Sequence, residues 1–198
     1  MGFTRYFETH KNGIPVAAWK KILSDTRKLL SNLPTHSTNA GGYYSDDPLE
    51  IAFEDDQPNK APEVSDSLIR FNGKGNLGHE TFYFERKPEM PDYQKEDGNK
   101  TVFAFCKTAR KPYDLVVCGV LIVAAKHAGR YVTVSSDGDL SDWMPAFEWV
   151  TSILGPEYAA SAVAARLKGG DFQLGGVPED ESAEVPRGTS APVQVGAL

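Results

Sequence analysis

Hydrophobic and polar residues partly alternate at the start of the chain, and the pattern then changes to helical spacing. The aromatic segment Phe3–Phe7 predicts a first strand. From Pro15 onward, apolar residues recur every three or four positions, with lysines and arginines between them. The apolar residues of this stripe are Ala18, Trp19, Ile22, Leu23, Leu29 and Leu30. This spacing predicts an amphipathic helix that ends near Pro34.

Short hydrophobic segments separated by turn-forming residues occupy the middle of the chain. Ser67–Phe71, Glu80–Glu85 and Thr101–Cys106 have the length and composition of strands. Asn72 and Gly73 open the turn-rich stretch between the first two segments. We therefore expect an antiparallel connection between them.

Residues 35–67 form a long acidic segment that contains several glycines and prolines. Clustered carboxylates can bind calcium, but their spacing here does not match an EF-hand loop, which alternates its ligands around a central glycine. We therefore expect a solvated acidic loop that contains one short strand, at Leu49–Phe53.

The longest apolar stretch, residues 113–128, has no polar face, which is typical of a buried helix. Its many valines make a strand the alternative. The length of the stretch and the polar pair Lys126-His127 before Gly129, which has the character of a C-cap, favour a helix.

Three further elements are expected after this stretch: a strand at residues 131–134 and helices at residues 141–154 and 156–169. Mostly consecutive strands with helices between them predict an α+β fold, a two-layer sandwich in which helices cover one side of a mostly antiparallel sheet. We expect a single domain over residues 1–169. Residues 170–198 are rich in glycine, proline and acidic residues, which predicts a flexible acidic tail.

The charge distribution argues against a nucleic-acid-binding protein. The chain of 198 residues has a formal net charge of −6. Five acidic residues and one arginine after Gly170 contribute −4 of it, which leaves about −2 for the remainder. Binding to a phosphate backbone needs clustered lysine and arginine, so we expect no direct nucleic-acid contact.

The cysteines and the apolar segments indicate the kind of cellular compartment in which the protein functions. Cys106 and Cys118 are too few for a disulfide scaffold, and we expect both to be buried thiols in a reducing compartment. The first residues lack the apolar core of a signal peptide. The run Leu115–Ala125 is about half as long as a membrane-spanning helix. We therefore expect a protein that is neither secreted nor embedded in a membrane.

A basic loop before the buried helix is the strongest candidate site. Lys107, Arg110 and Lys111 supply three positive charges, and Thr108 adds a hydroxyl. The amides at a helix N-terminus attract anions, so this loop fits a phosphate or a carboxylate. Supporting candidates around it are Asn72, His79, Glu80, Asp114, Ser135 and Asp137. The alternative is that the basic side chains are solvated or pair with acidic neighbours among these residues.

A hydrolase is a weaker alternative, with Cys106 or the turn Ser135–Asp137 as the reactive group. A nucleophilic cysteine needs a nearby base and a lowered pKa, and the sequence contains no local signature of such a site. The four histidines are far apart and no cysteine pair has zinc spacing, so we expect no metal and no cofactor.

Three segments of the chain resemble an uncharacterised family of bacteriophage and bacterial proteins. They are Met1–Tyr6; Phe71-Asn72-Gly73 with His79–Phe82; and the central Phe105–Asp114 followed by Val134–Gly138. The resemblance covers roughly residues 1–150 and implies a phage origin, with the protein in the host cytoplasm or the virion. It implies no catalytic residues, because no activity is established for the family.

These observations lead to three functional hypotheses. The first is a non-catalytic virion or protein-interaction component that contacts other protein subunits through its C-terminal tail, where Val193-Gln194-Val195 could add to a sheet edge. The second is a protein that binds a phosphate-containing small molecule or nucleotide through residues 107–111, with counter-defence as one role to consider. The third is the hydrolase or transferase described above.

Overall fold

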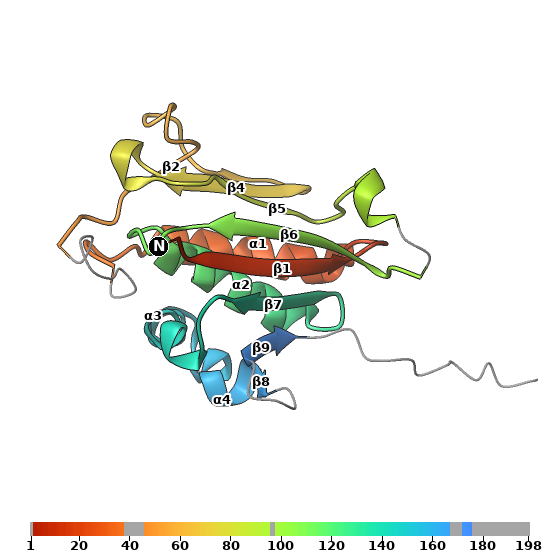
Figure 1. Cartoon of the computed structure of the whole chain (residues 1–198). Coiled ribbons are helices and arrows are strands. Elements are labelled where there is room, and N and C mark those ends of the chain that lie inside the picture. The colour runs from red at the N-terminus through yellow and green to blue at the C-terminus, as the bar shows by residue number, and fades with distance from the viewer. Residues whose placement is uncertain (1, 38–45, 96–97, 167–171, 176–198) are drawn as a thin grey trace, which may run out of the picture.

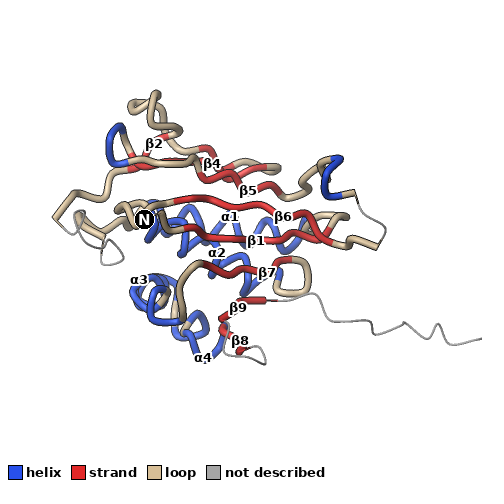
Figure 2. The backbone as a smooth tube through the Cα atoms, in the orientation of Figure 1, coloured by secondary structure: helices blue, strands red, loops and turns tan. Residues whose placement is uncertain are grey.

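The computed structural model describes residues 2–37, 46–95, 98–166 and 172–175. Antiparallel strands form an open layer, and the helices pack against one side of it (Figure 1). The tube drawing separates the strand layer from the helices behind it (Figure 2). This arrangement confirms the predicted α+β class, with helices on one side of a mostly antiparallel sheet.

The main sheet has five strands in the order β6-β1-β7-β9-β8. Their bounds are β1 Thr4–His10, β6 Thr101–Lys107, β7 Val132–Ser136, β8 Ala164–Arg166 and β9 Phe172–Gly175. β1 pairs with β6 along its whole length and with β7 on its other side. Because side chains alternate along a strand, Arg5, Phe7 and Thr9 are buried toward the helices, whereas Tyr6 and Glu8 lie on the opposite face.

A smaller sheet continues the strand layer beside β6. It contains β2 Ile51–Ala52, β3 Glu63–Val64, β4 Leu68–Gly73 and β5 Phe82–Glu85, and β4 pairs with the other three. The Glu80 amide, just before β5, donates to the Lys107 carbonyl at the end of β6 over 3.3 Å. The two sheets therefore meet edge to edge (Figure 1).

The helices are α1 Val16–Leu30, α2 Asp114–Ala128, α3 Met144–Leu154 and the short α4 Ala160–Val163. α2 lies at the centre, and all its residues from Asp114 to Ala125 are buried against the sheet, α1 and α3. The structure confirms the prediction of a buried helix over the valine-rich stretch. A helix without a polar face needs neighbours on every side, and this fold supplies them.

The C-terminal part differs from the prediction. The expected helix over 156–169 is replaced by the 3-10 turn η5 Pro156–Tyr158, by α4 and by β8. Alanine favours a helix locally, but pairing with β9 holds Ala164–Arg166 as a strand, so tertiary context overrides propensity. β9 itself falls inside the range predicted as tail, and its Leu174 is buried opposite Val134. Residues 176–198, including Val193-Gln194-Val195, lie outside the described residues.

Candidate functional site

The predicted basic loop connects the end of β6 to the start of α2. Ala109 and Arg110 both have positive φ, at 53° and 58°. This left-handed conformation costs an L-residue about 1–2 kcal/mol, so surrounding contacts must maintain it. The amides of Thr108 and Ala109 both donate to the Phe3 carbonyl, over 2.9 and 3.0 Å. These two bonds attach the loop to the residue that precedes β1.

A fully buried ion pair lies directly beneath the loop. Arg5 Nε and Nη2 donate to the two oxygens of Asp114 over 3.0 and 2.7 Å, and both side chains are fully buried. The Thr108 hydroxyl donates to the same carboxylate over 2.6 Å. Burial alone lowers the pKa of Arg5, but the Asp114 carboxylate outweighs it, and the net effect raises this pKa. The guanidinium therefore stays charged inside the protein.

Two aromatic rings lie close to this guanidinium. Arg5 Cζ lies 4.6 Å from the ring centroid of Trp143 and 4.5 Å from that of Phe3. On Phe3, Arg110 Cζ lies 3.8 Å from the ring centroid. Arg110 Nη1 also donates to Asp142 over 2.5 Å. Two arginines and two carboxylates thus form a charge-balanced cluster that joins β1, the basic loop and the segment before α3.

The remaining groups of the predicted anion site also contact protein. Lys111 Nζ donates to the Asn76 carbonyl over 2.6 Å, and the Lys107 amide donates to the Glu80 carboxylate over 2.7 Å. At the start of α2, the Leu115 and Val116 amides donate to carbonyls of the preceding turn. Anion binding by Lys107, Thr108, Arg110 and Lys111 stays a prediction, because no contact with an anion tests it.

The supporting candidates lie around the same end of the strand layer, mostly in structural contacts. The Asn72 side chain bonds both the amide and the carbonyl of His79, each over 3.1 Å, and so closes the turn before β5. Asp137 accepts from the Thr4 amide over 2.9 Å and from the Tyr6 hydroxyl over 2.6 Å. Ser135 pairs with Tyr6 across β1 and β7.

The reactive-cysteine hypothesis meets a physical obstacle. Cys106 is fully buried, its thiol donates to the Glu80 carbonyl over 3.4 Å, and it lies 4.0 Å from the Tyr113 hydroxyl. Burial raises the pKa of this thiol well above its ordinary value, so the nucleophilic thiolate is not available at neutral pH. Such a thiol would need a base, and the side chain of His79, a histidine that would have to serve as one, is exposed while the thiol is buried. We do not propose this hypothesis further.

Sequence reasoning missed Arg5 and Asp142, the two residues that complete the charged cluster. A signal for Arg5 was present, because period-two alternation places it on the same face as Phe3 and Phe7. A charged residue at such a position needs a buried partner. Asp142 had no comparable local signal, since the path of the turn after β7 determines its position.

A different candidate surface lies on the side of the strand layer away from the helices. We call it the aromatic face, and it consists of Tyr6, Tyr83, Tyr93, Phe103 and Phe105. The rings of Tyr6 and Phe103 stack at 6.0 Å between centroids, and those of Phe103 and Phe105 lie 6.2 Å apart. Tyr93 is 80% exposed and Phe105 is 54% exposed. Large aromatic side chains are thus gathered in contact with solvent.

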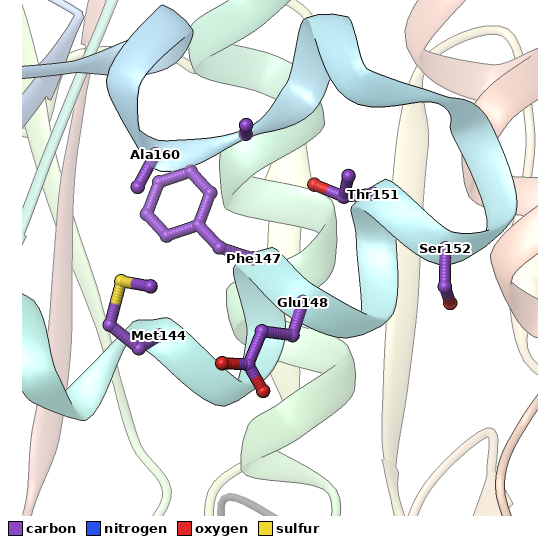
Figure 3. Close-up of a pocket in the computed structure, with 7 residues that line it drawn as sticks. Met144, Phe147, Glu148, Thr151, Ser152 and Ala160 are labelled. Atoms are coloured by element: carbon purple, nitrogen blue, oxygen red, sulfur yellow. The ribbon is translucent and has the colours of Figure 1, made fainter.

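An apolar pocket of about 380 Å³ lies elsewhere, between α3 and the segment that leads into α4. Figure 3 shows Met144 and Phe147 facing Ala160, while the Glu148 carboxylate points away from the Phe147 ring. The hydroxyl of Thr151 is buried, and among the described residues it has no hydrogen-bond partner. Nothing in these contacts selects a particular ligand, so we assign none to this pocket.

Two properties of the described ranges bear on the remaining predictions. No helix in this part of the chain combines the length and the apolar character needed to cross a bilayer. In the same residues, no group of three or more histidines, cysteines or acidic side chains is arranged to hold a metal ion.

Comparison of the chain with known protein families, with curated proteins and with solved structures found no match. The resemblance to a bacteriophage family therefore stays a prediction from the sequence.

Proposed function

We propose that this chain is a non-catalytic protein-interaction component that binds another protein through the aromatic face. The observation that carries the proposal is the gathering of exposed aromatic rings on the side of the strand layer opposite the helices. Exposed clusters of this kind mark interaction sites in soluble proteins.

The chemistry of these side chains supports a protein partner. Tyrosine and phenylalanine are enriched at the centres of protein interfaces, where each ring buries a large area at a low cost in conformational entropy. The ring of Phe103 already lies against the rings of Tyr6 and Phe105, so these side chains lose less conformational entropy when a partner binds. The antiparallel pairs beneath them keep the backbone of the face in place.

Charge complementarity favours a partner with basic side chains around an apolar centre. The chain carries a formal net charge of −6, of which −4 belongs to residues after Gly170. On the aromatic face itself, Glu8 lies beside Tyr6 on β1, and Lys107 lies at the end of β6. A second copy of the chain has the same charge and is repelled at long range. We therefore commit to a different protein as the occupant of the aromatic face.

The setting expected from the sequence, a bacteriophage virion or the cytoplasm of its host, belongs to this proposal. Its support is the resemblance of the three sequence segments described above. Mass spectrometry of purified particles tests it directly, because a virion-associated protein is present in them at a constant ratio to the other subunits.

The interaction is tested with the full-length chain and two surface variants. Crosslinking in native lysate or particles, followed by mass spectrometry, identifies partners whose crosslinks map to residues near Tyr83 and Phe105. The identified partner is then purified, and its affinity is measured by calorimetry. We expect Tyr83→Ser combined with Phe105→Ser to weaken binding at least tenfold, because aromatic residues dominate interface energies.

The matched control is Val16→Ser, which removes an equally exposed apolar side chain from α1, on the helix side. It should leave the affinity unchanged. The proposal is wrong if the double variant binds the purified partner as tightly as the native chain. It is also wrong if size-exclusion chromatography shows a homodimer that the double variant dissociates, because the face then serves self-association.

A further inference from the structure

A polar cleft of about 310 Å³ lies at one end of the aromatic face, between β1, β6 and the 3-10 turn η3 Asp92–Gln94. It is lined by Glu8, Tyr93, Gln94, Asn99, Thr101 and Phe103. Its volume falls within the range of small-ligand sites. The cleft is distinct from the charged cluster beneath the basic loop.

Hydrogen bonds between its lining residues fix the cleft and use most of its donors. The Gln94 side chain bonds both backbone groups of Phe103: its oxygen accepts from the amide over 2.8 Å, and its nitrogen donates to the carbonyl over 3.0 Å. The same nitrogen lies 3.3 Å from the Tyr93 hydroxyl. The Asn99 amide donates to the Gln94 carbonyl over 2.7 Å. The groups that remain available to a ligand in the cleft are therefore mainly hydrogen-bond acceptors and the faces of aromatic rings.

Glu8 supplies the charge. Its Oε2 accepts from the Thr101 hydroxyl over 2.6 Å, and Phe103 lies directly opposite it on β6. Among the residues that the structure describes, no lysine, arginine or histidine lies within ion-pair distance of this carboxylate. A partly buried carboxylate without a cation favours a positively charged ligand, because opposite charges attract strongly away from bulk water.

The combination of a carboxylate and aromatic rings identifies the ligand class. Ammonium groups bind at ring faces and donate hydrogen bonds to carboxylates. The side-chain donors of Gln94 and Thr101 are already bonded within the protein, so the cleft offers a sugar fewer donors than acceptors. A guanidinium prefers two free carboxylate oxygens, whereas Oε2 of Glu8 is already bonded to Thr101. The compact ammonium group of lysine fits best.

We propose that this cleft binds the ammonium group of a lysine side chain. The inference rests on the proposed interaction function for the source of that lysine, which we place on the protein that covers the aromatic face. The ring of Tyr93 and the carboxylate of Glu8 are the two groups that recognise it.

The test uses the isotope-labelled full chain and small probes, without the partner. Nα-acetyl-lysine methylamide is titrated while the NMR signals of the Thr101 and Phe103 amides are followed. We expect saturable shifts at millimolar probe and at least tenfold weaker binding of the analogue acetylated on its side-chain nitrogen, which has no charge. The arginine analogue should bind more weakly than the lysine probe.

Variants then distinguish the contribution of the Glu8 charge to binding from that of the Tyr93 ring. Glu8→Gln keeps an acceptor for Thr101 but removes the charge, and should weaken the lysine probe about tenfold. Tyr93→Ala should weaken it severalfold, whereas Tyr93→Phe retains the ring and the affinity. Glu50→Gln, a carboxylate change on the other sheet, is the control and should have no effect.

Equal binding of the charged and neutral probes, unchanged binding to Glu8→Gln, or the absence of saturable shifts would each overturn the proposed lysine site. These outcomes are separate from a failure of the interaction function. If the lysine probe binds as expected but the Tyr83 and Phe105 variant leaves partner affinity unchanged, the interaction function is wrong and the cleft remains an ammonium site.

Discussion

Ala109 and Arg110, in the loop before α2, hold a left-handed conformation that glycine adopts more readily. Ala109→Gly removes this strain, which is about 1–2 kcal/mol, but also increases the entropy of the unfolded chain. We expect the first effect to be larger, so that the free energy of unfolding rises by about 0.5–1 kcal/mol. Urea unfolding followed by circular dichroism measures this change.

The same substitution in a right-handed helix should change the free energy of unfolding in the opposite direction. Ala125→Gly in α2 is expected to lower the free energy of unfolding by about 1 kcal/mol or more, because glycine has a poor helix propensity and a methyl group is lost from a buried position. If both variants are destabilised to the same degree, the conformation of Ala109 stores no strain and this explanation is wrong.

The buried pair Arg5–Asp114 should be among the most sensitive positions in the chain. Asp114→Asn removes the negative charge that pairs with Arg5. Because Arg5 is fully buried, water cannot solvate its guanidinium in place of the lost carboxylate. Such a break is expected to lower the free energy of unfolding by about 3–5 kcal/mol. The half-exposed pair Lys74–Glu50 is the control, and Glu50→Gln should cost about 0.5 kcal/mol or less.

A double-mutant cycle separates the pair from its surroundings. Arg5→Met combined with Asp114→Leu leaves no unpaired charge, so we expect the double variant to be more stable than Arg5→Met or Asp114→Leu alone. A double variant as unstable as the sum of its single variants would show that packing around Trp143, and not the ion pair, determines the effect.

At the residue scale, the sequence indicated a structured basic loop but not the partners of its side chains. One alternative considered from the sequence paired the bases of the loop with acidic neighbours such as Asp114, but the structure pairs Asp114 with Arg5, which is 109 residues distant. Arg110 pairs with Asp142 from yet another segment. Local patterns carry no information on which distant carboxylate a given arginine meets, because the packing of α2 against β1 decides it.

A hydrogen-bonded triad of Asp25, His127 and Tyr158 joins α1, α2 and η5. Asp25 Oδ2 on α1 accepts from the Tyr158 hydroxyl of η5 over 2.5 Å and lies 2.7 Å from His127 Nε2 on α2. Lys28 donates to the other oxygen of Asp25 over 3.1 Å. Burial by itself raises the pKa of Asp25, but the hydrogen bonds from Tyr158, His127 and Lys28 outweigh it and lower this pKa below its ordinary value of 3.8.

The lowered pKa of Asp25 predicts a pH dependence of stability. The folded state binds fewer protons here than the unfolded state, so the contribution of this carboxylate is complete above about pH 5. It is lost as the pH falls past 3.8 and through the lower folded pKa. Asp25→Asn should therefore lower the free energy of unfolding at pH 7, and the difference from the native chain should shrink toward pH 3.

Urea unfolding at pH 7, 5 and 3 measures this difference. Asp92→Asn, a change in an exposed pair with Lys95, is the control and should match the native chain at each pH. A difference between Asp25→Asn and the native chain that is as large at pH 3 as at pH 7 would mean that the ionised carboxylate is not the source of the stability.

At the element scale, elements with a long regular pattern were predictable, and the short strand β2 lies within the predicted segment Leu49–Phe53, whereas β3 and β8 were not predicted. Apolar residues follow a regular pattern over the whole of α1, α2 and β1. They form a stripe in α1, a continuous run in α2 and an aromatic segment in β1. β3 and β8 contain two and three residues, and their strand character comes from pairing with β4 and β9. The sequence of so short a segment does not determine its partner.

At the scale of the whole molecule, the helices leave one face of the strand layer open, and this gives the aromatic face its exposure. α1 and α2 cover one side of the strand layer (Figure 1). Phe7, Phe82 and Phe84 are buried and in ring contact, so the alternate residues of the same strands lie on the opposite side, toward solvent. The sequence alone could not show this, because β5 and β6 belong to different sheets and become neighbours only when those sheets meet edge to edge.

The position of β9 in the main sheet predicts how far the chain can be shortened from its C-terminal end before the folded domain loses stability. Leu174 is fully buried and β9 pairs with both β7 and β8, so Phe172–Gly175 belongs to the domain although its sequence surroundings are typical of a tail. A chain that ends at Gly170 should have a free energy of unfolding about 2–4 kcal/mol lower than one that ends at Gly175, mainly from the loss of Leu174. Because both chains lack the same later residues, the comparison isolates β9. Leu174→Ala in the full-length chain should reproduce most of the loss, and equal unfolding midpoints of the two truncated chains would show that the sheet is complete without this strand.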